Sequence, residues 1–352
     1  MTERPISWDE IFEKLTEKQN LSDLQINWAM SQILDGLANN DQIKNFLLLL
    51  KAKGEKPSEV RALVDVMYQR GIAINIAERA VDIVGTGGDG ASTINISTTA
   101  AIITTAAGAR TIKHGNRAAS SKSGAADLLE ALGIDISLGA EQIQECVRRI
   151  GIGFAFAPVF HPAMKNAASA RRELATPTVF NILGPLANPA KPKAVAIGVA
   201  RAELLELVAT VLAERGCEGF IFRGDDGLDE ISLSTTSTIF QINNGEITRH
   251  IFDPSELGLE RVGIEELRGG TPSENADITR AIFAGKGGAY RQAVLLNAAA
   301  AIAAFKGDFH LGLTQQLANG YTLAKQAVDS GAAAQLVERW ANLSTELAKS
   351  SL

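Results

Sequence analysis

Cysteine and long apolar runs are both scarce in this chain. Its two cysteines, Cys146 and Cys217, lie far apart without metal-binding spacing, which suits a reducing cytoplasm rather than a disulfide framework. No apolar run free of charge reaches about 18 residues, so we expect no membrane span. The first residues lead directly into polar helix signals, and we therefore expect no signal peptide.

Positive charge is scarce too. The chain carries 34 lysines and arginines against 40 acidic residues, a net charge of −6, so no nucleic-acid partner is expected. It has four histidines and shows no Ser-His-Asp set, catalytic cysteine or H-E-x-x-H motif, which argues against the common hydrolase chemistries. At 352 residues the chain exceeds the ~250–300 of a typical single core, which predicts two domains.

A glycine-rich turn is the most informative feature that is present. The apolar residues 80–84 predict a buried strand, Gly85-Thr-Gly-Gly-Asp89 a tight turn, and residues 95–98 the start of a helix. Glycines let the backbone approach an anion, and a helix N-terminus offers it free N–H groups. Asp89 indicates a cation or a sugar hydroxyl beside the bound phosphates. Alone, the turn is also compatible with a connection that binds no ligand.

A second segment rich in hydrogen-bond donors follows one helix later. Residues 113–124 hold three cations, three serines, an asparagine and two glycines, and no acid occurs before Asp127. An ordinary solvated loop would mix in acidic residues. Two anion-binding turns on successive strand–helix units predict one ligand that carries two separated phosphates.

Acidic residues form the third feature. Asp225-Asp226 and Asp229-Glu230 follow a predicted strand at 219–222. Carboxylates at the end of a strand suit Mg²⁺, which proteins usually hold through one or two carboxylates and substrate phosphates. An acidic surface turn is the alternative, because Asp-Gly clusters are common in turns.

Three further positions lie between these features. His161 precedes Pro162, and we expect it to be structural or capping, since no carboxylate or nucleophile lies near it in sequence. Arg171 is a candidate for binding a substrate carboxylate through a bidentate pair, although an exposed helix face is the alternative. Gly184-Pro185 is typical of a place where a chain changes direction.

The order of elements predicts an α/β protein with a small N-terminal all-α domain and a larger domain built on a mainly parallel sheet. Capping boxes at Ser7 and Ser22 and the near absence of glycine before Gly54 indicate helices over about the first 75 residues. The apolar run 46–50 fits a core helix better than a dimer contact. Later, strands alternate with helices, and Asn244-Gly245 predicts one hairpin. The strands are expected at 82–85, 111–113, 153–156, 195–198 and 219–222, and closing helices at 289–305, 313–330 and 332–348.

Taken in order, these segments resemble the anthranilate phosphoribosyltransferases of tryptophan biosynthesis. The matching runs are Gly-Thr-Gly-Gly-Asp from Gly85, Asn-Ile-Ser-Thr from Asn95, Lys-His-Gly-Asn-Arg from Lys113 with Ser-Ser-Lys-Ser-Gly from Ser120, His-Pro-Ala-Met-Lys from His161, Phe-Asn-Ile-Leu-Gly-Pro-Leu from Phe180 and Asp-Gly-Leu-Asp-Glu-Ile from Asp226. They cover about residues 80–235, and the flanking helices extend the resemblance to nearly the whole chain. Several long motifs in one order are far more specific than any single loop.

The resemblance implies the transfer of a phosphoribosyl group from 5-phosphoribosyl-1-diphosphate to the amine of anthranilate, with Mg²⁺ and two ions expected. It implies a small helical domain at residues 1–78, to which helices from about 163–185 return. The α/β domain would comprise residues 79–162 and 186–352. It also implies a homodimer formed through the small domain.

The resemblance further assigns roles to single residues. No catalytic base is expected, because the amine attacks with its own lone pair. Anthranilate is assigned to Gly85, Asn116 and Arg171, and the metal to Ser97, Asp229 and Glu230. The chain departs from the family at Ala125, where a serine is usual, so one hydroxyl contact to the diphosphate substrate is in doubt. Positions assigned to that substrate are Gly85, Gly88, Asp89, Thr93, Asn95, Ile96, Ser97, Thr98, Lys113, His114, Gly115, Asn116, Arg117, Ala118, Ala119, Ser120, Ser121 and Ala125.

Two other functions remain open at this point. A pyrimidine nucleoside phosphorylase also places phosphate at a glycine-rich turn, but it needs no acidic pair at 229–230. A non-catalytic nucleic-acid-binding relative of the same fold would show a basic face and would lack that pair. The acidity of the chain argues against the second alternative.

Overall fold

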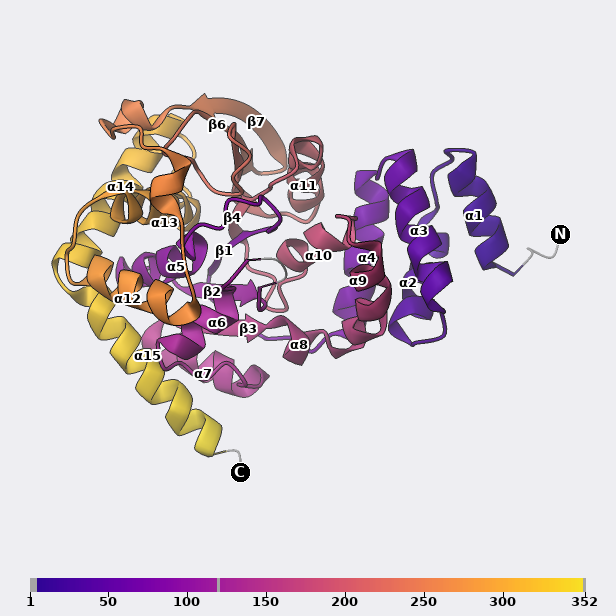
Figure 1. The fold of residues 1–352 in the computed structure, drawn as a ribbon, viewed down its shortest axis with the longest axis horizontal. Coiled ribbons are helices and arrows are strands. Elements are labelled where there is room, and N and C mark those ends of the chain that lie inside the picture. Colours follow the sequence, from indigo (N-terminus) through magenta and orange to yellow (C-terminus); the bar gives the residue numbers. More distant parts are fainter. Residues whose placement is uncertain (1–4, 119–120, 351–352) are drawn as a thin grey trace.

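A computed structural model describes residues 5–118 and 121–350. A helical bundle forms one end of the molecule and an α/β body forms the rest, with α1 far from the C-terminal helix α15 (Figure 1). The predicted fold class is confirmed. Among the described helices, none is both long enough and apolar enough to cross a membrane.

The bundle forms where the sequence places its helix caps. The Ser7 side chain accepts a hydrogen bond from the Glu10 amide, and Ser22 and Asn39 each complete a capping box. Phe46, Leu47 and Leu50 are fully buried in this bundle, so the apolar run lies on a core helix as predicted, although Leu48 within it is 41% exposed. The four helices are α1 (Trp8–Thr16), α2 (Asp23–Leu34), α3 (Asn40–Lys53) and α4 (Pro57–Arg70).

A later stretch of chain returns to the bundle. Ala170 of α9 and Phe180 and Leu183 of α10 share one apolar core with the bundle helices. The segment comprises α8 (Ala157–Phe160), the 3₁₀ helix η1 (Pro162–Ala167), α9 (Ala168–Leu174) and α10 (Phe180–Leu186).

The central sheet has seven described strands in the order β3-β2-β1-β4-β5-β6-β7. The first five are parallel, and β6 and β7 are antiparallel additions joined at Asn244-Gly245, as the hairpin signal predicts. All five expected parallel strands are confirmed, within two residues at either end. The strands are β1 (Val81–Gly85), β2 (Thr111–Gly115), β3 (Ile152–Phe156), β4 (Ala194–Gly198), β5 (Glu218–Gly224), β6 (Ser237–Asn243) and β7 (Glu246–Phe252).

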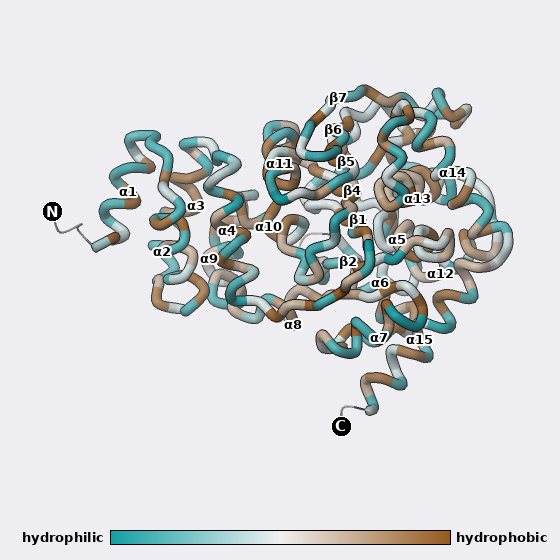
Figure 2. Tube along the Cα trace, turned by 180° about the vertical axis from the view of Figure 1, so that it is seen from behind, coloured by the Kyte–Doolittle hydropathy of each residue, from teal (hydrophilic) through white to brown (hydrophobic). Residues whose placement is uncertain are grey.

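Helices cover both faces of the sheet. Ala194 and Ala196 of β4 point into a core shared with α5 and α13, whereas Val195 and Ile197 point to α11 and the bundle. Along most helices hydrophilic and hydrophobic stretches alternate (Figure 2), as expected when one side of each is buried. The helices of this body are α5 (Ile96–Ala106), α6 (Ala125–Ala131), α7 (Ala140–Ile150), α11 (Ala202–Glu214), α12 (Pro272–Phe283), α13 (Ala289–Lys306), α14 (Leu313–Asp329) and α15 (Ala332–Lys349), with short 3₁₀ turns η2 (Pro254–Leu257) and η3 (Ile264–Leu267).

Two local expectations are wrong. Gly184-Pro185 does not mark a turn, because both residues lie inside α10, with Pro185 one position before its last residue. The missing N–H of Pro185 costs this short helix one backbone hydrogen bond, close to its C-terminal end. Residues 113–115 belong to strand β2, so the second donor-rich loop begins only at Asn116.

Candidate active site

The candidate site lies where the strand order of the sheet changes direction. From β1 the chain proceeds to β2 and β3 on one side, and then returns to β4 and β5 on the other. Ligands of open α/β sheets bind outside the carboxyl ends of the strands at such a switch point. Here those ends are Gly85 of β1 and Gly198 of β4, which are paired in register.

The acidic segment crosses both strand ends because both end in glycine. A β-carbon on Gly85 would lie 2.2 Å from Oδ2 of Asp229, and one on Gly198 would lie 1.7 Å from the Asp229 carbonyl oxygen. The amide of Gly87 donates to Oδ2 of Asp229 at 2.6 Å. The glycine-rich turn and the acidic pair are therefore one structure, although 142 positions separate Gly87 from Asp229.

The hydroxyl and the backbone amide of Thr86 fix the start of this turn. The Thr86 hydroxyl accepts a hydrogen bond from the Ala200 amide at 3.1 Å, and the Thr86 amide donates to the Gly198 carbonyl at 3.0 Å. Gly87 and Gly88 have φ angles of 71° and 85°, a left-handed backbone that only glycine adopts without strain. The turn thus presents peptide groups rather than side chains to the space in front of it.

Asp229 and Glu230 are buried beside a single buried lysine. Only 8% of Asp229 and 6% of Glu230 is exposed, and Lys113 is 1% exposed. The Lys113 ammonium donates to the Ile83 carbonyl and to Ser97 Oγ, at 2.5 and 3.3 Å, and the Ser97 amide donates to Oε1 of Glu230 at 3.1 Å. The start of α5, the end of β2 and the acidic segment therefore meet at one point.

This arrangement leaves the site short of positive charge. Burial, and then the neighbouring Asp89 carboxylate, raise the pKa of Asp229 to about 7. Burial and the charge of Asp229 raise the pKa of Glu230 well above its usual value. Burial lowers the pKa of Lys113, against the pull of Asp82 and of the acidic pair. A bound divalent cation would relieve the repulsion between these carboxylates.

The donor set fits a metal ion that a phosphate-bearing ligand completes. No three acidic, histidine or cysteine side chains in the described part of the chain gather closely enough to hold a metal by themselves. Two carboxylates and the Ser97 hydroxyl do offer hard oxygen ligands, which is the partial set that Mg²⁺ takes beside substrate phosphates. Asp226 instead accepts the Ser232 hydroxyl at 2.6 Å, within the turn that follows β5.

The second loop is held closed at its base by Asp127, which the sequence did not single out as functional. Oδ2 of Asp127 accepts the amides of Ala118 and Gly124 at 3.2 and 2.8 Å. Arg117 pairs with Asp127 and Glu130 at 2.8 and 2.5 Å, so this cation of the donor-rich segment already has acidic partners from α6. Ala119 and Ser120, assigned to the diphosphate substrate, lie outside the described residues.

The two loops contact each other through Asn95. Its side-chain nitrogen donates to the Ser123 carbonyl at 2.9 Å, and its oxygen accepts from Ser123 Oγ and from Asn275 at 3.0 and 2.8 Å. Asn95 therefore joins the first turn to the second loop and to α12. Ala125, at the departure from the family, is the first residue of α6 directly after the loop.

The other residues assigned to the diphosphate substrate lie in α5, in β2 and in the segments that adjoin them. Thr98 and Ile96 are both 2% exposed in α5, and Thr93 forms an isolated β-bridge with Arg268. Gly115 ends β2, and the Asn116 side chain accepts the Arg117 amide at 2.7 Å. These positions all border the two loops, and their contacts with substrate remain predictions.

Each of the two histidines near the site has one ring nitrogen within hydrogen-bond distance of a backbone carbonyl. Nε2 of His161 lies 2.8 Å from the Ala187 carbonyl, which agrees with the structural role expected for this residue. His114 lies with Nδ1 2.9 Å from the Ala155 carbonyl, and its ring centre is 5.3 Å from that of His161. Burial lowers the pKa of His114 to about 3, so its imidazole stays neutral. The other ring nitrogen of His114, Nε2, is buried and has no hydrogen-bond partner among the described residues.

Arg171 lies on α9, in the part of the chain that packs on the bundle, and not on the body that carries the phosphate turn. Its side chain is exposed, as the alternative of an exposed helix face predicts, and it has no hydrogen bond or ion pair to another described residue. The protein packed around it lowers its pKa by desolvation. A guanidinium in this situation has its planar donors available for a carboxylate.

Comparison with known proteins agrees with this geometry. Residues 77–334 match the model of the glycosyl transferase family, a/b domain, and residues 9–71 match the helical bundle domain of the same family. The anthranilate phosphoribosyltransferase of Rhodococcus jostii is 50% identical over 98% of this chain and 95% of its own. The enzyme of the same name from Nocardia farcinica is 49% identical over 95% of this chain and 98% of its own. The chain belongs to the anthranilate phosphoribosyltransferase family.

Solved structures of the anthranilate phosphoribosyltransferase family match the whole fold. The enzyme of Thermus thermophilus superposes with a TM-score of 0.87 at 36% identity, covering 95% of this chain and 99% of that one. The enzyme of Saccharomyces cerevisiae, solved in complex with PRPP and Mg, gives a TM-score of 0.88 at 28% identity, covering 97% and 98% of the two chains.

Sequence reasoning missed the residues that hold the predicted ones in place. Asp82, Asp127, Asn188 and Asn275 all make side-chain hydrogen bonds to the loops or strands of the site, that of Asn275 being to the Asn95 side chain. Asp127 had a usable signal, since an acid three residues after Gly124 is typical of a helix N-terminus. Asn188 had only a local turn signal, since it precedes Pro189 and its Oδ1 accepts the Ala190 amide at 3.0 Å. Nothing in the sequence marks the partners of its side-chain nitrogen, which lie 76 and 106 positions away.

Proposed function

We propose that the protein transfers the phosphoribosyl group of 5-phosphoribosyl-1-diphosphate to the amine of anthranilate, giving N-(5-phosphoribosyl)anthranilate and diphosphate in tryptophan biosynthesis. The observation that carries this proposal is the joining of a phosphate-binding turn to a buried acidic pair at the switch point of the sheet. The relatives named above supply the identity of the substrates. The Saccharomyces cerevisiae enzyme has been solved with PRPP and Mg and with 4-fluoroanthranilate.

Different residues are proposed to bind the phosphates and the metal ion. The backbone of the Gly85–Asp89 turn and the N-terminal end of α5 bind the phosphates, and Lys113 adds a buried positive charge. Asp229, Glu230 and Ser97 would hold Mg²⁺, which when bound neutralises charge on the diphosphate as it leaves. We propose two ions, supported by the presence of a third carboxylate, Asp89, close enough to raise the pKa of Asp229.

Positioning supplies the remainder of the catalysis. Arg171 would bind the carboxylate of anthranilate and Asn116 and Gly85 would border it, so that the amine faces the ribosyl carbon. No general base is proposed, because the amine attacks with a lone pair and the two histidines near β2 are buried against backbone carbonyls. The proposed contacts to the diphosphate substrate comprise the full set of positions that the resemblance assigns.

The assembly and the location are also proposals. The division into residues 1–78 and the α/β remainder is supported by the separate family matches at 9–71 and 77–334. Leu24, Leu37 and Leu48 are 70%, 66% and 41% exposed on the bundle, which supports a homodimer formed through this domain. The two free thiols support a reducing, cytoplasmic location.

One assay tests the function. Purified protein is mixed with anthranilate, phosphoribosyl diphosphate and Mg²⁺, and the loss of anthranilate fluorescence is followed. Loss that requires all three components is expected. Phosphate-dependent cleavage of thymidine or uridine without Mg²⁺ would indicate a nucleoside phosphorylase instead, and a DNA mobility shift at moderate salt would indicate the nucleic-acid-binding alternative.

A further inference from the structure

The first two parallel strands of the sheet separate almost as soon as they meet. β1 and β2 are in register only at Val81 and Thr111. By contrast, β1 pairs with β4 from Val81 through Gly85, and β2 pairs with β3 along its whole length. The gap between β1 and β2 opens toward the carboxyl ends, where the candidate site lies.

Two buried side chains bridge this gap from the face that α10 covers. Oδ1 of Asp82 accepts the His114 amide at 3.3 Å, and Nδ2 of Asn188 donates to Oδ2 of Asp82 and to the Ile112 carbonyl, both at 2.8 Å. Asp82 is 1% and Asn188 3% exposed. These side chains therefore replace backbone ladder bonds between the two strands, and losing either would leave buried polar groups without partners.

Lys113 bridges the same gap from the opposite face. Residues 82 and 83 point to opposite sides of the sheet, and Lys113 reaches the Ile83 carbonyl on the side of Ser97. Directly after Lys113 and His114 the chain enters the second loop at Asn116. The distance between the phosphate turn and this loop is thus set by side chains instead of by regular strand pairing.

We propose that Asp82 and Asn188 are positioning residues, which fix how far β1 and β2 separate and thereby aim Lys113 and the second loop at the diphosphate substrate. This inference rests on the proposed function. Neither residue is proposed to touch the reacting atoms.

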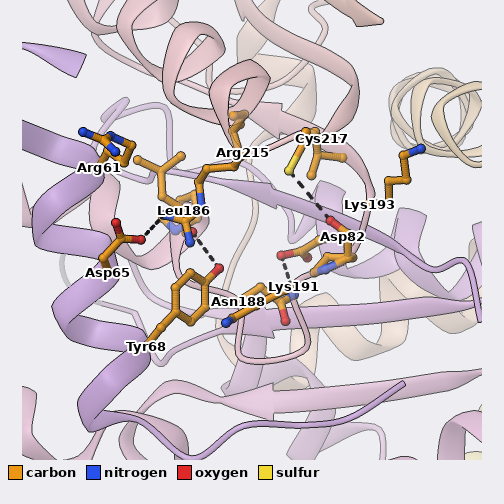
Figure 3. A pocket seen from close by; sticks show the side chains of 15 residues that line it. Arg61, Asp65, Tyr68, Asp82, Leu186, Asn188, Lys191, Lys193, Arg215 and Cys217 are labelled. Carbon is orange, nitrogen blue, oxygen red and sulfur yellow. Dashed lines mark hydrogen bonds and ion pairs between the residues drawn. The ribbon is translucent and has the colours of Figure 1, made fainter. Parts of the chain in front are cut away.

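Residues of the helical bundle lie close to Asp82 and Asn188. Asp82 and Asn188 form part of the wall of a cavity of about 340 Å³, whose other walls include Tyr68 of α4 and Arg215 after α11 (Figure 3). The Tyr68 hydroxyl donates to the Leu186 carbonyl at 3.1 Å, two residues before Asn188. The segment that carries Asn188 is therefore held by the bundle as well as by the sheet.

The test compares Asn188→Ala with Gln316→Ala, a matched control far from the site. Gln316 is also 3% exposed and also bridges two segments, donating to the Leu311 carbonyl and to Gln241 at 2.8 and 3.0 Å. Both variants should lower Tm by similar amounts. Only Asn188→Ala should raise KM for phosphoribosyl diphosphate, by about tenfold or more, and speed hydrogen exchange at residues 112–116.

Asp82→Asn is the second variant, because it keeps the volume and an acceptor for the His114 amide but sets a nitrogen or a weaker acceptor against Asn188. It should also raise KM for this substrate. If Asn188→Ala and Asp82→Asn both keep KM for phosphoribosyl diphosphate within about twofold of the parent value despite a lower Tm, the inference is overturned. A parent protein that consumes no anthranilate would instead refute the proposed function, while hydrogen exchange at residues 112–116 would still test the bridge.

Discussion

The fold opposes the charge of Asp229. Its pKa rises from an ordinary value of 3.8 to about 7, chiefly through burial. Between pH 3.8 and about 7, the folded protein therefore holds a proton on Asp229 that the unfolded chain has released. The contribution of this proton to the free energy of unfolding is fully present below pH 3.8 and is lost as the pH rises through about 7.

Asp229→Asn should consequently stabilise the protein at pH 8 in the absence of metal and substrate. The amide keeps an oxygen for the Gly87 amide but carries no charge, and we expect a gain of about 2–4 kcal/mol in the free energy of unfolding. The gain should shrink toward pH 5, where the carboxyl of the parent protein is protonated. Urea titrations at both pH values measure it.

The same charge should be essential to turnover. Asp229→Asn combined with Glu230→Gln should abolish activity at ordinary Mg²⁺ while the protein stays folded, because neutral amides ligate this ion poorly against water. Steady-state rates across a Mg²⁺ titration, with circular dichroism as the check on folding, provide the measurement. Near-normal rates in the double variant would show that this pair is not the metal site.

Arg171 and Arg172 offer an internal comparison on one helix. Arg171→Ala should raise KM for anthranilate by roughly 10- to 150-fold, the equivalent of one lost charged hydrogen bond, and should change KM for the diphosphate substrate much less. Arg172→Ala should leave both values nearly unchanged, because the next helical residue points about 100° away. Equal effects on both substrates would give Arg171 a structural role.

At the scale of elements, the sequence predicts whatever depends on neighbours along the chain. The five parallel strands, the Asn244-Gly245 hairpin and the caps at Ser7 and Ser22 follow from local alternation and turn chemistry, and all are found. Gly184-Pro185 was misplaced because a proline near the end of a short helix resembles one in a turn.

In the candidate site, too, the sequence predicts only the features that depend on neighbouring residues along the chain. The glycine-rich turn and the acidic pair were recognised separately, from their own residues. Their direct contact, through the Gly87 amide and Asp229, depends on glycines at the ends of two different strands. Nothing local marks the role of Asn188 between the strands: its Oδ1 accepts the nearby Ala190 amide, but the two partners of its side-chain nitrogen are brought to it only by the completed sheet.

The second loop should respond to the diphosphate substrate. Asp127 fixes its base by accepting the amides of Ala118 and Gly124. With Mg²⁺, phosphoribosyl diphosphate should slow hydrogen exchange at residues 116–118 and 121–124, because its phosphates accept from these donors. Anthranilate alone should have much less effect. Equal protection in the free protein would mean a preformed site without a closing loop.

At the scale of the whole molecule, the bundle carries most of the large exposed apolar side chains among the described residues. If these surfaces meet in a homodimer, Leu37→Glu with Leu48→Glu should convert the protein to monomers, because each new charge would be buried at the contact. Sedimentation velocity measures the change. Ile251→Glu is the control, since Ile251 is 52% exposed on β7, away from the bundle. A parent protein that is already monomeric would refute the proposed assembly.

The return of α9 and α10 to the bundle limits how this protein can be recombined with its relatives. Phe180 and Leu183 fill the bundle, and the same apolar core continues through α11 to Val195 and Ile197 on the sheet. A chimera that exchanges only the N-terminal helices would therefore pair a bundle with side chains selected for another one. Grafts that carry residues 168–186 along with the first four helices keep that packing intact, and these are the exchanges that should yield folded hybrids.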